Sequence, residues 1–173
     1  RASAIHLLIG LALSTAMGLI PYAPTLNPGQ RPVNVDWVYY YRWLTQMAGG
    51  DFSVLLTCSD RPLYLLLLYA AWRISGVDLR ALALYHNVAL FPLYTFSLYL
   101  LAKRWLGERV AGYTALLAPF SPILLSFIYG GFQANLFALS LVYLSLYLLA
   151  GSRREASLGL TILFMAMFIH EWT

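Results

Sequence analysis

Two charged side chains in the first half of the chain are suited to acid–base or phosphate chemistry. Asp36 precedes the aromatic run WVYYYRW, and Arg61 stands directly before Pro62 and a leucine-rich run. A positioned carboxylate can serve as general base on a hydroxyl group, and a guanidinium can hold a phosphate through paired hydrogen bonds. Each residue also has a simpler interpretation, because Asp is a preferred helix cap and Arg often extends to lipid phosphates.

Polar residues at two later positions are further candidates. Gln133 and Asn135 lie in a short connection between apolar segments, and His170 and Glu171 end the last apolar segment. Ionisable groups at such an end are costly if they face lipid and often have a function. The simpler interpretation is a helix that leaves the membrane there. His86, inside another apolar segment, is interpreted as a hydrogen-bonded core residue.

The composition indicates which kind of protein must position these groups. Of the 173 residues, 61% are hydrophobic and 10% are charged, whereas a soluble domain has about 45–50% apolar and about 25% charged residues. So few charges cannot cover a water-facing globule. A soluble enzyme, a disordered tail and a nucleic-acid-binding module are therefore excluded, and the sequence predicts an all-α, polytopic membrane helical bundle.

A membrane-crossing helix needs about 20 apolar residues, and five segments qualify as candidates. They cover residues 2–21, 81–102, 110–128, 132–150 and 156–173, with a predicted kink in the third at Pro119 and Pro122.

The long connection 22–80 contains two further helical segments. Residues 36–48 carry apolar and aromatic residues at helical spacing and end at Gly49-Gly50. Residues 62–76 begin with Pro62, but their apolar run stops at Arg73 and is too short to cross. Both are predicted to be interfacial helices.

The positive charges favour this arrangement over one in which 62–76 crosses the bilayer. If 62–76 stays at the outer interface, the inner side has six basic and two acidic residues, a net charge of +4. The outer side then has five of each, which agrees with the excess of Lys and Arg in cytoplasmic loops. The inner residues are Arg1, Lys103, Arg104, Arg109, Arg153 and Arg154 with Glu108 and Glu155.

The order of these motifs resembles the polytopic glycosyltransferases of the GT-C class, most closely the protein-mannosyltransferase-like and aminoarabinose-transferase-like families. The matching segments are VDWVYYYRW, AGGD, DRPLYLLLLYAAWRISG, AKRWLGERVAGYTALL and PFSPILLSF. The resemblance covers residues 2–173. It implies that residues 1–173 form one transmembrane domain, the N-terminal piece of a longer chain with further helices after Thr173.

The resemblance also implies a function and roles for particular residues. Such enzymes transfer a sugar, with inversion, from a polyprenyl-phosphate donor to a lipid, glycan or protein acceptor on the extracytoplasmic side of the plasma membrane. Asp36 would act as the base or position the acceptor, and Arg61, with Arg42 on the same predicted interfacial surface, would bind the donor phosphate.

One departure from the family pattern leaves alternatives open. Many relatives have a second acidic residue in the outer loop that here reads YGGFQANLF, with Gln133 and Asn135 in its place. The amides, together with His170 or Glu171, could contact the substrate or a divalent metal such as Mg²⁺ or Mn²⁺, and the reaction could equally be metal-independent. A non-catalytic scaffold of the same fold and a transporter or channel subunit are the competing functions.

Overall fold

The computed structural model describes residues 2–29, 31–33, 35–57 and 61–170. Every regular element in these ranges is a helix, so the all-α prediction is confirmed for the described chain. The elements are α1 (Ala2–Leu19), η1 (Ile20–Tyr22), α2 (Trp37–Ala48), α3 (Val54–Thr57), α4 (Pro62–Ser75), α5 (Leu79–Leu106), α6 (Glu108–Leu117), η2 (Ala118–Phe120), α7 (Pro122–Tyr129), α8 (Gln133–Leu149) and α9 (Arg153–Ile169).

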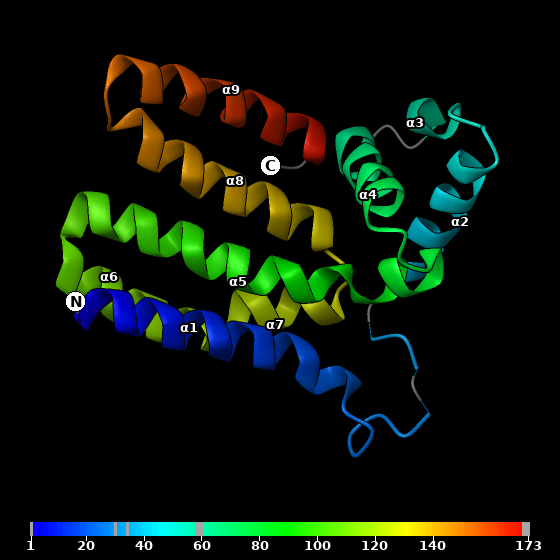
Figure 1. The fold of residues 1–173 in the computed structure, drawn as a ribbon, viewed down its shortest axis with the longest axis horizontal. Coiled ribbons are helices and arrows are strands. Elements are labelled where there is room, and N and C mark those ends of the chain that lie inside the picture. The colour runs from blue at the N-terminus through cyan, green and yellow to red at the C-terminus, as the bar shows by residue number, and fades with distance from the viewer. Residues whose placement is uncertain (1, 30, 34, 58–60, 171–173) are drawn as a thin grey trace.

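The long helices form a bundle in which α1, α5, α8 and α9 run side by side, with α6 and α7 together forming a further layer (Figure 1). Within the described residues, helix covers each of the five predicted segments to within a few residues; the end of the fifth, residues 171–173, lies outside them. The third is divided by the 3₁₀ turn η2, where Pro119 and Pro122 interrupt the α-helix as expected. The second, by contrast, continues through Pro92 as one helix.

Among the described residues, three helical segments are long and apolar enough to cross a membrane, namely Ala2–Tyr22, Leu79–Leu106 and Glu108–Phe127. The helix α8 is apolar but shorter. These segments indicate an integral membrane protein, since about 20 apolar residues span a bilayer.

Polarity in the bundle is distributed in the opposite way to a soluble protein. Small polar side chains lie buried between helices, for example Ser14 of α1 against Thr95 of α5, whose hydroxyl groups are hydrogen-bonded. Large apolar side chains face outward, including Leu8 of α1 and Phe164 of α9, which are 67% and 61% exposed. Water-facing surfaces rarely carry so many apolar groups together.

Small residues bring α1 close to its neighbours. Gly10, Ser14 and Gly18, four residues apart, are the buried residues of α1. A side chain at Gly10 would collide with the backbone carbonyl of Ala115 in α6, and one at Gly18 would meet the backbone of Val88 in α5. Such small-residue stripes allow close helix packing in membranes.

The helices α2, α3 and α4 gather at one end of the bundle, near the end of α1, the start of α5 and the end of α9 (Figure 1). We call this the α2–α4 end. Helix α4 packs against α2, α9 and the start of α5 and does not extend along the bundle. It ends at Gly76, whose φ of +66° closes the helix in a left-handed turn.

Candidate functional site

The side chain of Asp36 is not used to cap a helix. Asp36 occupies the N-cap position of α2, and its carbonyl accepts the first intrahelical bond from the N–H of Tyr40, but its carboxylate makes no capping hydrogen bond. The simpler sequence interpretation of this residue is therefore wrong for the side chain. Its carboxylate is directed instead to a partner in α4.

That partner is Arg61, at the N-cap position of α4. Its Nη1 donates to Oδ2 of Asp36 at 2.9 Å and to the hydroxyl of Tyr40 at 2.9 Å. The side chains of Arg61 and Asp36 are 15% and 21% exposed. The guanidinium also lies 5.7 Å from the ring centre of Tyr40 and 6.0 Å from that of Trp43. The sequence predicted Asp36 and Arg61 at one depth, and the structure joins them in a mostly buried ion pair.

The turn between α7 and α8 lies against this ion pair. Gly131 has a φ of +78°, and a Cβ built on it would be 3.0 Å from Cγ and 3.2 Å from Oδ1 of Asp36. Among the described residues, Oδ1 of Asp36 makes no hydrogen bond. Gly131 therefore leaves room beside one oxygen of the Asp36 carboxylate. It lies in the same YGGFQANLF loop as Gln133 and Asn135.

The polar residues that follow in α8 connect this turn to the end of α9. Asn135 is 3.3 Å from Nδ1 of His170 through its amide nitrogen, and His170 is 6% exposed. Gln133 is 1% exposed, and both polar atoms of its amide have no hydrogen-bond partner among the described residues. The structure thus brings Gln133, Asn135 and His170 to the α2–α4 end of the bundle.

Beneath the ion pair is an aromatic layer. Tyr40 packs edge-on against Tyr64 of α4 and His86 of α5, with ring centres 5.5 Å and 5.2 Å away. The Nδ1 atom of His86 lies within hydrogen-bond distance of two backbone carbonyls, which agrees with the expected core role. Burial raises the pKa of the Tyr64 hydroxyl well above its usual range, so it stays protonated. Its oxygen has no partner among the described residues.

Two predicted site residues are not part of this arrangement. Arg42 points from the exposed face of α2, opposite to Tyr40, Leu44 and Met47, and the structure does not bring it to Arg61. Glu171 lies outside the described residues. Within the described chain, no group of three or more His, Cys, Asp or Glu side chains could hold a metal ion.

Two residues of the site were not singled out from the sequence. The hydroxyl of Tyr40 accepts from Arg61. Tyr40 follows Asp36 by four residues and so lies on the same side of α2, and this spacing could have indicated that it belongs to the site. Gly131 has no sequence signal beyond the pair Gly130-Gly131, because its contact with Asp36 depends on how α2 meets the bundle.

Comparisons with known proteins give no relative on which to base a role for this site. No protein-family model matches the sequence, and searches of curated proteins and of solved structures find no match.

Proposed function

We propose that this chain is a polytopic membrane protein that transfers a sugar from a polyprenyl-phosphate donor to an acceptor, at the α2–α4 end of its bundle. In this proposal α1, α5, α6–α7, α8 and α9 cross the bilayer, and α2 and α4 lie in its interface. The outward-facing apolar side chains and the buried hydroxyl groups support the membrane placement. Exposed Tyr39 and Tyr41 on α2 suit the interface.

The distribution of charge supports an extracytoplasmic α2–α4 end. The turns between α5 and α6 and between α8 and α9 lie at the opposite end of the bundle, with the start of α1 (Figure 1). The described charged residues there are five basic and two acidic, namely Lys103, Arg104, Arg109, Arg153 and Arg154 with Glu108 and Glu155. An excess of basic residues is typical of the cytoplasmic side.

One observation carries the functional proposal: the carboxylate of Asp36 is held by Arg61 at the rim of the bundle instead of capping α2. The stability of the helix alone would explain an aspartate that caps it. A mostly buried ion pair differs, because it needs well-placed partners to offset the cost of removing its charges from water. The pair sets a carboxylate and a guanidinium side by side, and these are the two groups that transfer from a phosphate-linked sugar requires.

The proposed reaction assigns one role to each charge. The acceptor hydroxyl attacks the anomeric carbon and gives its proton to Asp36, while the bond from that carbon to the phosphate oxygen breaks. Polyprenyl phosphate leaves with the bonding electrons, and Arg61 stabilises the negative charge that develops on it. Attack opposite to the leaving group inverts the anomeric centre. Gln133, Asn135 and His170 lie at the same end to contact sugar hydroxyls.

The test is a transfer assay with radiolabelled polyprenyl-phosphate sugars on the full-length protein in membranes. Because a general base contributes about 10²–10⁴-fold, Asp36→Asn should lower turnover at least about 100-fold. Asp51→Asn is the matched control, since Asp51 lies in the same connection, is exposed, and its carboxylate accepts from the N–H and the hydroxyl of nearby Ser53.

Two results would overturn the proposal in different ways. Wild-type turnover by Asp36→Asn would remove Asp36 from the chemistry. Correctly folded full-length protein that transfers no sugar from any polyprenyl-phosphate donor would favour the non-catalytic scaffold.

Sidedness is tested by labelling single cysteines in a Cys58→Ser background with a membrane-impermeant maleimide. Leu56 of α3 is 84% exposed at the α2–α4 end, and Arg154 is exposed at the opposite end. On intact cells, Leu56→Cys should react and Arg154→Cys should react only after permeabilisation. The reverse pattern would contradict the proposed orientation.

A further inference from the structure

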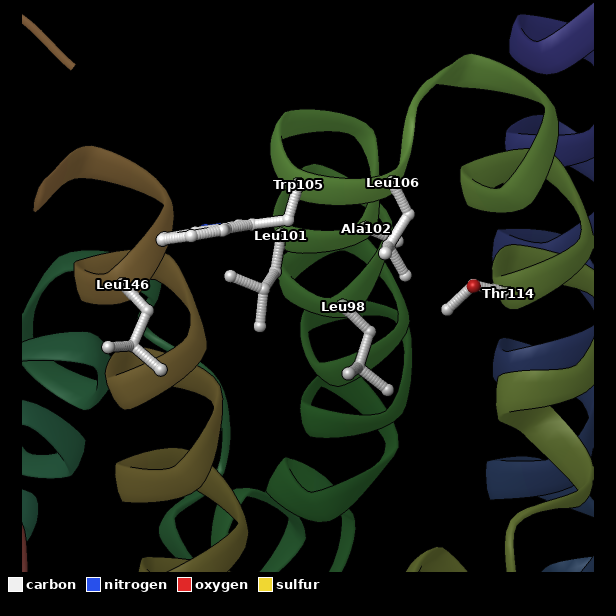
Figure 2. A pocket seen from close by; sticks show the side chains of 7 residues that line it. All are labelled: Leu98, Leu101, Ala102, Trp105, Leu106, Thr114 and Leu146. Atoms are coloured by element: carbon white, nitrogen blue, oxygen red, sulfur yellow. The ribbon is translucent and has the colours of Figure 1, made fainter. Parts of the chain in front are cut away.

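An open apolar groove lies between α5, α6 and α8, at the end of the bundle opposite to Asp36 and Arg61 (Figure 2). Its volume is about 440 Å³, within the range of about 300–1,000 Å³ typical of ligand clefts. Leu98, Leu101, Trp105, Thr114 and Leu146 are among its lining residues. The groove therefore suits a hydrocarbon chain and offers few groups to a polar ligand.

Trp105 marks the end of this groove nearest the basic turns. Its side chain is 65% exposed, and its ring extends from α5 toward α8 above Leu101 and Leu146 (Figure 2). Tryptophan is enriched at the level of lipid head groups. A lipid whose acyl chain lies in the groove below Trp105 would thus have its head group beside the Trp105 ring.

Arg104, the basic residue next to Trp105 in the chain, is the candidate to bind that head group. Its Nε and Nη2 donate to the carbonyl of Ala150 at the end of α8, at 3.2 Å and 2.6 Å, and its guanidinium lies 5.7 Å from the ring centre of Tyr147. These contacts hold its guanidinium against the end of α8, just outside the residues that line the groove. Unlike Lys103, which is ion-paired with Glu108 at 3.0 Å, Arg104 makes its hydrogen bonds to a neutral carbonyl. Its charge acts on Glu155 only as a minor contribution to the lowered pKa of that carboxyl, so it can still attract an anion.

We propose that this groove binds an anionic phospholipid, with an acyl chain between α5, α6 and α8 and the phosphate at Arg104. The choice of lipid follows from charge complementarity, because basic pockets between membrane helices on the cytoplasmic side bind anionic head groups. The inference rests on the membrane placement in the proposed function, but it does not depend on sugar transfer or on Asp36.

The test measures quenching of Trp105 fluorescence by lipids with brominated acyl chains. Full-length protein is reconstituted in zwitterionic vesicles that contain a small fraction of brominated phosphatidylglycerol or, in parallel, of brominated phosphatidylcholine. The Trp105 signal is the difference between the protein and Trp105→Phe, because the chain has five tryptophans. Phosphatidylglycerol should be enriched at Trp105 by roughly fivefold, the effect of one cation near the membrane surface.

Variants separate the charge from the groove. Arg104→Gln should abolish the enrichment and Arg104→Lys should retain it, with Arg154→Gln as control for a basic residue at the same end. Thr114→Phe should fill the groove and lower quenching by both lipids. Its control is Thr161→Phe, which changes an exposed threonine of α9.

Equal quenching by the two lipids would overturn the proposal, since the groove would then face the bulk bilayer without selection. Absence of quenching by either lipid would also overturn it, because another helix or a second copy of the chain would then occupy the groove. Both outcomes are independent of the transfer assay, so loss of one proposal leaves the other standing.

Discussion

The two ends of the bundle hold their charged residues in different ways. At the α2–α4 end, Arg61 and Asp36 are 15% and 21% exposed, and Arg61 also donates to the hydroxyl of Tyr40. At the opposite end, Lys103 and Glu108 form a pair at a similar distance, but they are 44% and 63% exposed. An exposed pair contributes little to stability, whereas a buried one costs desolvation and needs its geometry fixed. Of the two carboxylates, that of Asp36 is therefore the one whose position the fold holds fixed.

Helix capping shows the same contrast. At the opposite end, Ser152 accepts from the N–H of Glu155, whose carboxylate accepts in turn from the N–H of Ser152, and the two form a capping box for α9. Asp78 caps α5 through the N–H of Ala81 at the α2–α4 end itself, so the contrast lies between Asp36 and these two caps. Asp36 stands at the corresponding position of α2 without capping it. Local structure explains Ser152 and Asp78, whereas Asp36 has a partner 25 residues away in the sequence.

The largest expected effect is that of Arg61→Ala, compared with Lys103→Ala. Removing Arg61 leaves the carboxylate of Asp36 mostly buried beside Tyr40 without its cation, which should lower the free energy of unfolding by about 3 kcal/mol. Lys103→Ala should lower it by less than about 1 kcal/mol. Denaturant unfolding of the detergent-solubilised variants measures the loss in unfolding free energy for each. Equal losses in the two variants would contradict the distinction between a buried and an exposed pair.

Gly131→Ala tests whether the α7–α8 turn keeps space for Asp36, with Gly76→Ala as a matched control. Both glycines have positive φ, +78° and +66°, but a Cβ at Gly76 meets nothing within 4 Å, whereas one at Gly131 meets Asp36. The left-handed conformation alone should cost about 1 kcal/mol at either site. Gly131→Ala should cost about 1 kcal/mol more in unfolding experiments, because overpacking is destabilising, and only this variant should reduce sugar transfer. Equal unfolding losses would indicate that the turn does not constrain Asp36.

Much of the fold was accessible from the sequence because its determinants are local. Apolar length located the helices of the bundle, Gly49 and Gly76 ended α2 and α4, and Pro119 and Pro122 broke the third long segment. The short helix α3 was not predicted, since four residues give no detectable period. The stripe Gly10–Ser14–Gly18 was not predicted, because its effect depends on which helices α1 meets.

The site was predicted less completely because its contacts are not local. The sequence could place Asp36 and Arg61 at one depth, but their hydrogen bond depends on how α4 turns back onto α2. For the same reason, spacing could not distinguish a capping Asp36 from a paired one. Arg42 appeared equivalent to Arg61 in charge and depth, yet it is about 200° around the α2 axis from Tyr40, by 100° per residue, and so faces away.

A smaller effect is expected from Ser152→Ala, which removes the hydroxyl that caps α9. Loss of such a cap costs about 1 kcal/mol, so the midpoint of denaturant unfolding should fall modestly while sugar transfer is unchanged. Ser152→Asp should restore most of the stability, because Asp is also a preferred cap. A large loss of transfer in Ser152→Ala would mean that the two ends are coupled, and the comparison between them would have to be abandoned.

The smallest expected effect distinguishes the two ion pairs by their response to salt. At about 1 M salt the screening length is about 3 Å, so the exposed pair of Lys103 and Glu108 should lose its small contribution. The unfolding difference between the protein and Lys103→Ala should then disappear, while that between the protein and Arg61→Ala should persist. The reason is that solvent ions screen exposed charges far more than mostly buried ones. If high salt removed the Arg61 difference as well, the pair with Asp36 would be open to solvent, and its use as a fixed carboxylate would lose its physical basis.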